Sequence, residues 1–172
     1  MVVPHQSGRT KISARAALMP PHDKATARVA RGLEPALIDH ETVTMSALEP
    51  GDGRRVDLKV AGPAALLTAK AIKIGERLEQ SAVQPGRLRE KDALDAFRIF
   101  QAIETDVLVQ GFAAHAGDEH ARAVTAEATE IYRAEASTID GRIAQLAATA
   151  AHGDRTVAPS FAALVTELLD EL

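Results

Sequence analysis

Two aspartates and three basic residues are spaced so that they can meet between neighbouring helices. Asp92 and Asp95 stand three positions apart near the start of a helix expected over residues 88–104. At about 100° per residue, Asp92 falls on the side of the apolar residues, and Asp95 lies about 60° away at its edge. A carboxylate that faces a core is costly unless a positive group meets it. We therefore expect a Lys or Arg partner for Asp92.

The segment before this helix supplies three such partners. Lys70, Lys73 and Arg77 lie within about 60° of one another on a helix expected over residues 63–80. Because the loop between the two helices is short, we expect them to be antiparallel neighbours, with Asp92 close to Lys70 or Arg77. The basic stripe runs beside an apolar one, formed by Leu67, Ala71, Ile74 and Leu78.

Spacing alone leaves two interpretations of these five residues open. The first is a functional site, in which a carboxylate holds a lysine charged and oriented. The second is structural: a basic stripe is usually solvated, an aspartate in the first turn of a helix usually serves its free N–H groups, and a buried ion pair need not be catalytic.

Composition narrows the class of protein. The chain has 172 residues, a net charge of −4, 3% aromatic residues and no cysteine. These values argue against a global basic field for nucleic acid, an aromatic platform for bases, and any site built on cysteine. The start, MVVPHQSGRTK, lacks the apolar core of a signal peptide, and no stretch is apolar for long enough to span a membrane, so we predict a cytoplasmic protein.

The order of patterns predicts an α+β fold in two parts. Residues 1–61 are expected to form a small, partial, mostly antiparallel sheet packed on the first helix, and residues 62–172 a helical domain. The sheet would include an edge strand over 11–18 and a hairpin of 41–48 with 55–62, the latter a half-buried strand with Val56, Leu58 and Val60 on one face. Such an exposed partial sheet would invite pairing with another chain. Helices are expected over 63–80, 88–104, 105–115, 119–136, 138–151 and 158–170.

The stretch VAGPAALLTAKAIKIGER followed by KDALDAFRIFQAI, within residues 60–103, resembles nucleotidyltransferase-fold proteins of the AbiEii/AbiGii type, the toxins of type IV toxin–antitoxin pairs. The shared pattern is a strand, a Pro-led helix with a Lys and an Arg seven residues later, a loop, and Lys-Asp-x-x-Asp before an aromatic-aliphatic run. Here these are Lys70, Arg77 and Lys91-Asp92-x-x-Asp95. The resemblance covers about residues 1–104.

The resemblance implies a role for each of the five residues. Lys70 would contact nucleotide phosphates, and Asp92 would orient Lys70 or assist proton transfer from the attacking hydroxyl. Arg77 and Asp95 would hold the two helices and shape the pocket, and Lys73 is expected to bind substrate together with them. The family implies Mg²⁺ and an NTP as cofactors, an antitoxin or another protein as partner, and a nucleotide or RNA in complete homologues. A lysine is suited to this work because nucleotidyl transfer develops charge on phosphate oxygens.

One departure from the family bears on activity. Family members carry Gly-Ser followed by Asp-x-Asp, which holds two Mg²⁺ ions. This chain has no such element: Ser7-Gly8 is reversed, and Asp52 and Asp57 have the wrong spacing. We therefore expect a nucleotidyltransferase-like protein that lacks its catalytic front half and is inactive as this chain alone. The alternative is a non-catalytic helical interaction or accessory domain that binds a protein partner. A homodimer is a separate expectation, which follows from the exposed partial sheet.

Other polar residues are weaker candidates. His115 and His120 are five apart across a glycine, which is not a helical pair of metal ligands. Asp39-His40-Glu41 is interpreted as a strand edge that faces water. A C-terminal apolar stripe is expected to pack on the bundle, with a dimer or antitoxin contact as the alternative; it consists of Leu164, Val165, Leu168, Leu169 and Leu172.

Overall fold

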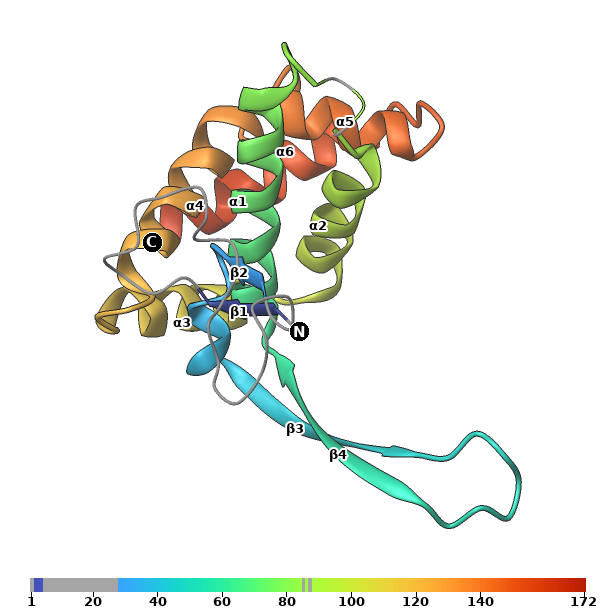
Figure 1. Cartoon of the computed structure of the whole chain (residues 1–172). Helices are drawn as coiled ribbons and strands as arrows, with labels where there is room; N and C mark the ends of the chain where they lie inside the picture. Colours follow the sequence, from blue (N-terminus) through green and yellow to red (C-terminus); the bar gives the residue numbers. More distant parts are fainter. Residues whose placement is uncertain (1, 5–27, 85, 87) are drawn as a thin grey trace.

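The computed structural model describes residues 2–4, 28–84, 86 and 88–172. Its layout is α+β, with short strands toward the N-terminal side followed by a bundle of helices (Figure 1), which confirms the predicted class. The strand expected over residues 11–18 lies outside the described residues. None of the helices in the described part of the chain is both long and apolar enough to cross a bilayer.

The described strands form two separate pairs. β1 (Val2–Pro4) runs parallel to β2 (Arg28–Ala30), and β3 (His40–Ser46) runs antiparallel to β4 (Arg55–Ala61). A short 3-10 helix, η2 (Pro35–Leu37), lies between β2 and β3. The predicted hairpin is confirmed, and its connection contains Gly51 at a φ of +85°, which suits glycine because it has no Cβ.

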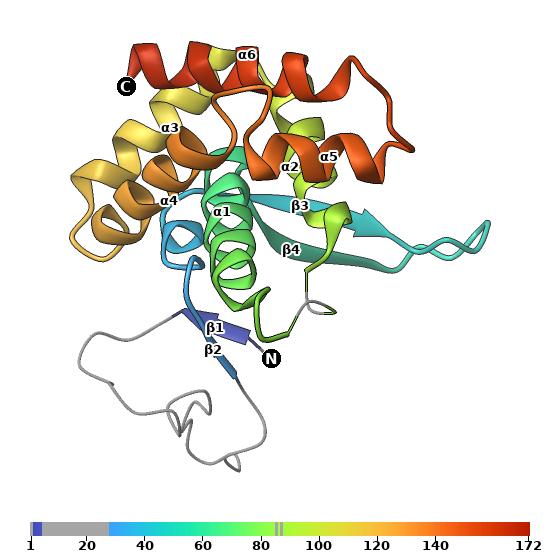
Figure 2. The same cartoon turned by 90° about the horizontal axis from the view of Figure 1, so that it is seen from above.

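The prediction of a half-buried strand in this hairpin is wrong. Val56, Leu58 and Val60 expose 53%, 42% and 40% of their surface. The β3–β4 ribbon extends away from the helices rather than lying on them (Figures 1 and 2), so nothing in the described part of the chain covers its apolar face. Alternation showed which side chains share a face of the strand, but not whether another layer packs on that face.

Six α-helices follow in the order that the sequence predicts. They are α1 (Pro63–Gln80), α2 (Glu90–Ala102), α3 (Thr105–Gly117), α4 (Arg122–Glu135), α5 (Arg142–Ala150) and α6 (Val157–Glu171). α1 has the predicted bounds because Gly62 and Pro63 start it. α4 begins three residues later than expected, because the Asp118 carboxylate accepts hydrogen bonds from the backbone N–H groups of His120 and Ala121 and stabilises a turn there.

α1 is the central element of the bundle, and it contacts α2, α3, α4 and η2. Its predicted apolar stripe is buried throughout, and so is Ile72 beside it. Tyr132 of α4 is also buried, and its hydroxyl donates a hydrogen bond of 2.9 Å to the carbonyl of Leu67. Four aromatic side chains pack against one another in the core: Phe97, Phe100, Tyr132 and Phe161.

The C-terminal apolar stripe packs on the helical bundle, as predicted. Val165 and Leu168 of α6 are buried in the core, and Leu164 and Leu169 pack against it. Only Leu172, at the end of the chain described here, is half exposed. Figure 2 shows α6 on the side of the bundle opposite β1 and β2, so it covers the core from that side.

The hairpin and α1 are joined through Asp39, which immediately precedes β3. The N–H of Gly62 donates to the carbonyl of Asp39 over 2.9 Å, and the N–H of Ala65 donates to Oδ2 of Asp39 over 2.9 Å. Asp39 thus supplies from outside α1 the acceptor that an N-cap residue usually supplies. A Cβ at Gly62 would lie 1.7 Å from Oδ1 of Asp39, so only glycine fits beside this carboxylate.

We predict that Gly62→Ala lowers the free energy of unfolding by about 1–3 kcal/mol, because the new methyl group displaces the Asp39 carboxylate from the start of α1. Urea denaturation followed by circular dichroism would measure the change. Gly53→Ala is the matched control: a Cβ there meets nothing within 4 Å, so its effect should stay within about 0.5 kcal/mol. Equal effects of the two substitutions would contradict this account.

Candidate functional site

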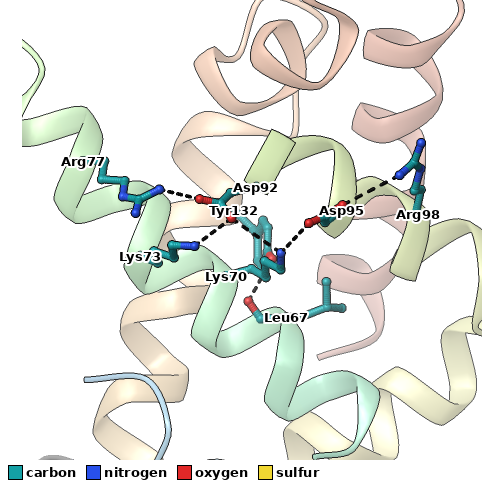
Figure 3. A network of polar contacts seen from close by, with 8 residues as sticks. All are labelled: Leu67, Lys70, Lys73, Arg77, Asp92, Asp95, Arg98 and Tyr132. Atoms are coloured by element: carbon teal, nitrogen blue, oxygen red, sulfur yellow. Dashed lines mark hydrogen bonds and ion pairs between the residues drawn. The ribbon is translucent and has the colours of Figure 1, made fainter. Parts of the chain in front are cut away.

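The structure brings together all five residues that the sequence singled out. Nζ of Lys73 lies 2.8 Å from Oδ1 of Asp92, and Nη1 of Arg77 lies 2.5 Å from Oδ2 of the same carboxylate. Nζ of Lys70 lies 2.9 Å from Oδ2 of Asp95 and 3.6 Å from Oδ1 of Asp92. Figure 3 shows these side chains pointing toward one another across the space between α1 and α2.

These contacts establish that α1 and α2 are antiparallel, as predicted. The later residue of α1, Arg77, pairs with the earlier aspartate, Asp92, while the earlier residue, Lys70, pairs with the later aspartate, Asp95. Asp92 therefore faces inward and is met by positive side chains of the neighbouring helix. The sequence analysis did not identify one further residue of this group, Arg98, whose Nη1 lies 3.8 Å from Oδ1 of Asp95. The i, i+3 spacing of the two residues within α2 could have indicated this contact.

Burial differs strongly within this α1–α2 charge network, defined here as Lys70, Lys73, Arg77, Asp92, Asp95 and Arg98. The Asp92 side chain is 11% exposed, whereas that of Lys73 is 47% exposed. Burial alone would raise the pKa of Asp92. The hydrogen bond from Lys73 and the charges of Lys73, Lys70 and Arg77 outweigh burial, so that the pKa lies below the ordinary value for aspartate.

The charge network carries more positive than negative groups. Four cations, Lys70, Lys73, Arg77 and Arg98, surround two carboxylates, which leaves a formal excess of +2. The more exposed cations are Lys73 at 47% and Arg98 at 63%. Such a group can bind an anion: lysine offers a point charge to a phosphate oxygen, and arginine offers two parallel N–H donors.

The same geometry does not fit a magnesium ion. Mg²⁺ is held by carboxylate oxygens that are open to the metal, and here both carboxylates already bind ammonium or guanidinium groups. Across the described ranges of the chain, no group of three or more His, Asp or Glu side chains gathers at ligand distance. The described residues therefore assemble no site for the metal that the family resemblance implies.

A second polar cluster lies at the start of α1, and sequence reasoning missed it. Oδ2 of Asp39 lies 3.1 Å from Nε2 of His115, a fully buried residue of α3, and it also accepts the hydrogen bond from Ala65. The interpretation of Asp39 as part of a water-facing strand edge is therefore wrong. Its target is 76 residues away in the sequence, so no local spacing could have indicated the contact.

His115 donates through Nε2 to the carboxylate, while its Nδ1 is buried without a hydrogen-bond partner. Burial lowers the pKa of His115, and the nearby charge and hydrogen bond of Asp39 oppose that shift only in part. The neutral imidazole is therefore the stable form in the folded protein. Gly111 of α3 permits the approach of α3 to α1, because a Cβ there would lie 2.6 Å from that of Ala64.

We predict that the stability of the protein falls as the pH drops below the ordinary histidine pKa of about 6.5. Because the pKa of His115 is lower in the folded state, the unfolded chain binds more protons in this range, so stability rises with pH and is lost as pH falls. Denaturation at pH 7.5 and 5.5 would measure the slope. His115→Gln should have a lower free energy of unfolding than the parent at pH 7.5. Its free energy of unfolding should fall less than that of the parent between pH 7.5 and pH 5.5. If the free energy of unfolding falls equally in the parent and in His115→Gln, groups other than His115 cause the pH dependence.

Comparison of the chain with protein-family models, with curated proteins and with solved structures gives no match.

Proposed function

We propose that this chain is a nucleotidyltransferase-like protein, related to AbiEii-type toxins, in which the α1–α2 charge network binds the phosphates of a nucleotide. One observation carries the proposal. The residues of the Lys…Arg…Asp-x-x-Asp pattern, spread from Lys70 to Asp95, converge into one network with contacts of 2.5–3.6 Å. Their excess of positive charge is opposite in sign to the charge of a polyphosphate.

The roles of the network residues follow from their surroundings. Lys73 and Lys70 are the phosphate-binding groups, because Lys73 is the most exposed of the α1 cations and Lys70 bridges both carboxylates. Asp92 orients these cations rather than accepting a proton, because the lowered pKa of its carboxylate makes it a weak base. Arg77 and Asp95 hold α1 against α2.

The proposal is limited to binding by the residues described. Transfer of a nucleotidyl group needs acids that hold Mg²⁺, and the described part of the chain does not assemble them. The chain would therefore bind an NTP without transferring it, and activity would require metal ligands from another source.

A second candidate function is a helical interaction or accessory domain in which the charge network is only structural. The observation in its favour is that the carboxylate of Asp92 already has its partners. The residue as a whole is 7% exposed, and its carboxylate is paired with three cations. A carboxylate satisfied to this degree is also what a purely structural ion cluster between two helices requires. Binding and stability measurements on the same variants separate the two functions.

We expect Lys73→Ala to weaken the binding of ATP, GTP, CTP or UTP at least tenfold in titration calorimetry, while the melting temperature changes little. The physical reason is the removal of a half-exposed phosphate ligand, while buried Asp92 keeps Arg77 and Lys70 as partners. Arg133→Ala is the matched control: it removes a half-exposed cation that pairs with Glu130 over 3.0 Å on α4, and it should leave binding unchanged.

Asp92→Asn and Lys70→Ala complete the test. If the parent binds a nucleotide and these variants lose binding while keeping their stability, the network is a binding site. If the parent binds none of the four nucleotides, and Asp92→Asn lowers the free energy of unfolding by about 3 kcal/mol, the network is structural and the interaction-domain function stands.

A further inference from the structure

We propose that two copies of this chain associate through the free edge of β4, joining their β3–β4 hairpins into one four-stranded antiparallel sheet. The inference rests on the strand RVDLKVA (Arg55–Ala61) and is independent of nucleotide binding. β4 pairs with β3 on one side, and no described element pairs with its other side. An unpaired edge presents a row of N–H and C=O groups that another strand can complete.

The hydrogen-bond pattern of the hairpin shows which residues face the free edge. The N–H of Ala47 donates to the carbonyl of Arg54, and the N–H of Gly62 donates to that of Asp39. Hydrogen-bonded pairs recur every second residue in an antiparallel ladder, so Val56, Leu58 and Val60 direct their backbone groups toward β3. The backbone groups that point to the open edge belong to Arg55, Asp57, Lys59 and Ala61.

The side chains of β4 are self-complementary about Leu58. If a two-fold axis passes through Leu58, Asp57 lies opposite Lys59 of the second copy, and Lys59 lies opposite Asp57 of that copy. Val56 then faces Val60 of the second copy, and the two Leu58 side chains meet on the axis. Acid meets base on one face and apolar meets apolar on the other, while the hydrogen-bonded pairs use the backbone groups that point outward.

Neighbouring registers of the same pairing are unfavourable. A two-fold axis through Asp57 would place the two Asp57 carboxylates opposite each other and would set Arg55 against Lys59. An axis through Lys59 would place the two Lys59 ammonium groups opposite each other. Like charges directly opposite destabilise a strand pair, so the axis through Leu58 is the favoured register.

The free edge of β3 lacks this complementarity. An axis through Val43, at the centre of that strand, would place Glu41 opposite Met45 and Thr42 opposite Thr44, so no acid would meet a base. Pairing of β3 with β4 of a second copy would be heterologous and would leave a free edge at each end, whereas pairing through β4 closes as a dimer.

Lateral contacts between exposed apolar side chains of the two copies would add to the backbone hydrogen bonds of the new strand pair. Met45, Val56, Leu58 and Val60 are all at least 40% exposed, and Val43 lies beside them on the same face. An isolated two-stranded ribbon is marginal in water, and three or more strands with an apolar face are far more stable. On the opposite face, Thr44 donates to Oδ1 of Asp57 over 2.6 Å, so Oδ2 can accept from Lys59 of the second copy.

Charge reversal provides a test that does not depend on one variant folding. The full chain should be a dimer by light scattering after size exclusion. Asp57→Lys and Lys59→Asp should each raise the dissociation constant at least tenfold, because each sets like charges opposite one another. An equimolar mixture of these two variants should form a heterodimer, since every reversed pair then regains its opposite charge. Glu41→Lys, on β3, is the control and should leave the dimer intact.

Cysteine cross-linking locates the axis, because the chain has no native cysteine. Under mild oxidation Leu58→Cys should form an intermolecular disulfide, since the two residues would face each other at a Cα separation of about 4.5 Å. Val56→Cys is the matched control: the two copies of that residue would lie roughly 13 Å apart along the ladder and should not be linked.

Three results would overturn the proposal. The first is a monomer at every concentration together with no cross-link through Leu58→Cys. The second is a dimer that both single charge reversals leave unchanged, which would place the interface elsewhere. The third is a mixture of Asp57→Lys and Lys59→Asp that stays monomeric although both variants are folded by circular dichroism.

Discussion

The carboxylate of Asp92 is the charge around which the two central helices are arranged. It is almost fully withdrawn from water, and an unpaired charge in such a place would cost several kcal/mol. Lys70, Lys73 and Arg77 of α1 pair with this carboxylate, and they lie three and four residues apart along one side of the helix. The pairs Arg77–Asp92 and Lys70–Asp95 agree with an antiparallel α2, and the same placement of α2 puts Phe97 and Phe100 in the core.

A similar constraint operates at the other end of α1. There the free N–H groups of the helix start are met by Asp39, and the same carboxylate accepts a hydrogen bond from buried His115. Gly62 and Gly111 leave room for this arrangement, because a side chain on either would collide with Asp39 or Ala64. α1 is therefore held by carboxylates near both ends, one contributed by α2 and one by the segment that leads into the hairpin.

These two anchors leave different surfaces for function. At the α2 side, cations outnumber carboxylates, and in the proposed function this excess charge would be available to an anionic ligand. At the opposite side, the β3–β4 ribbon leaves the bundle from Asp39 and carries an apolar face and an open edge. Binding of phosphate and pairing of strands would thus use separate parts of the molecule, and neither would require the other to be disturbed.

Local sequence patterns by themselves determined much of this protein: the hairpin, the order of the six helices, the start of α1 at Gly62-Pro63, and the stripe of Lys70, Lys73 and Arg77 facing Asp92. These features depend on residues close in sequence, where a period of 3.6 or 2 identifies a face. Only the tertiary structure decided that Val56 and Leu58 are exposed and that Asp39 turns inward to His115. The physical reason is that alternation marks a face without stating what covers it, and a hydrogen bond between residues 76 apart leaves no local pattern to detect.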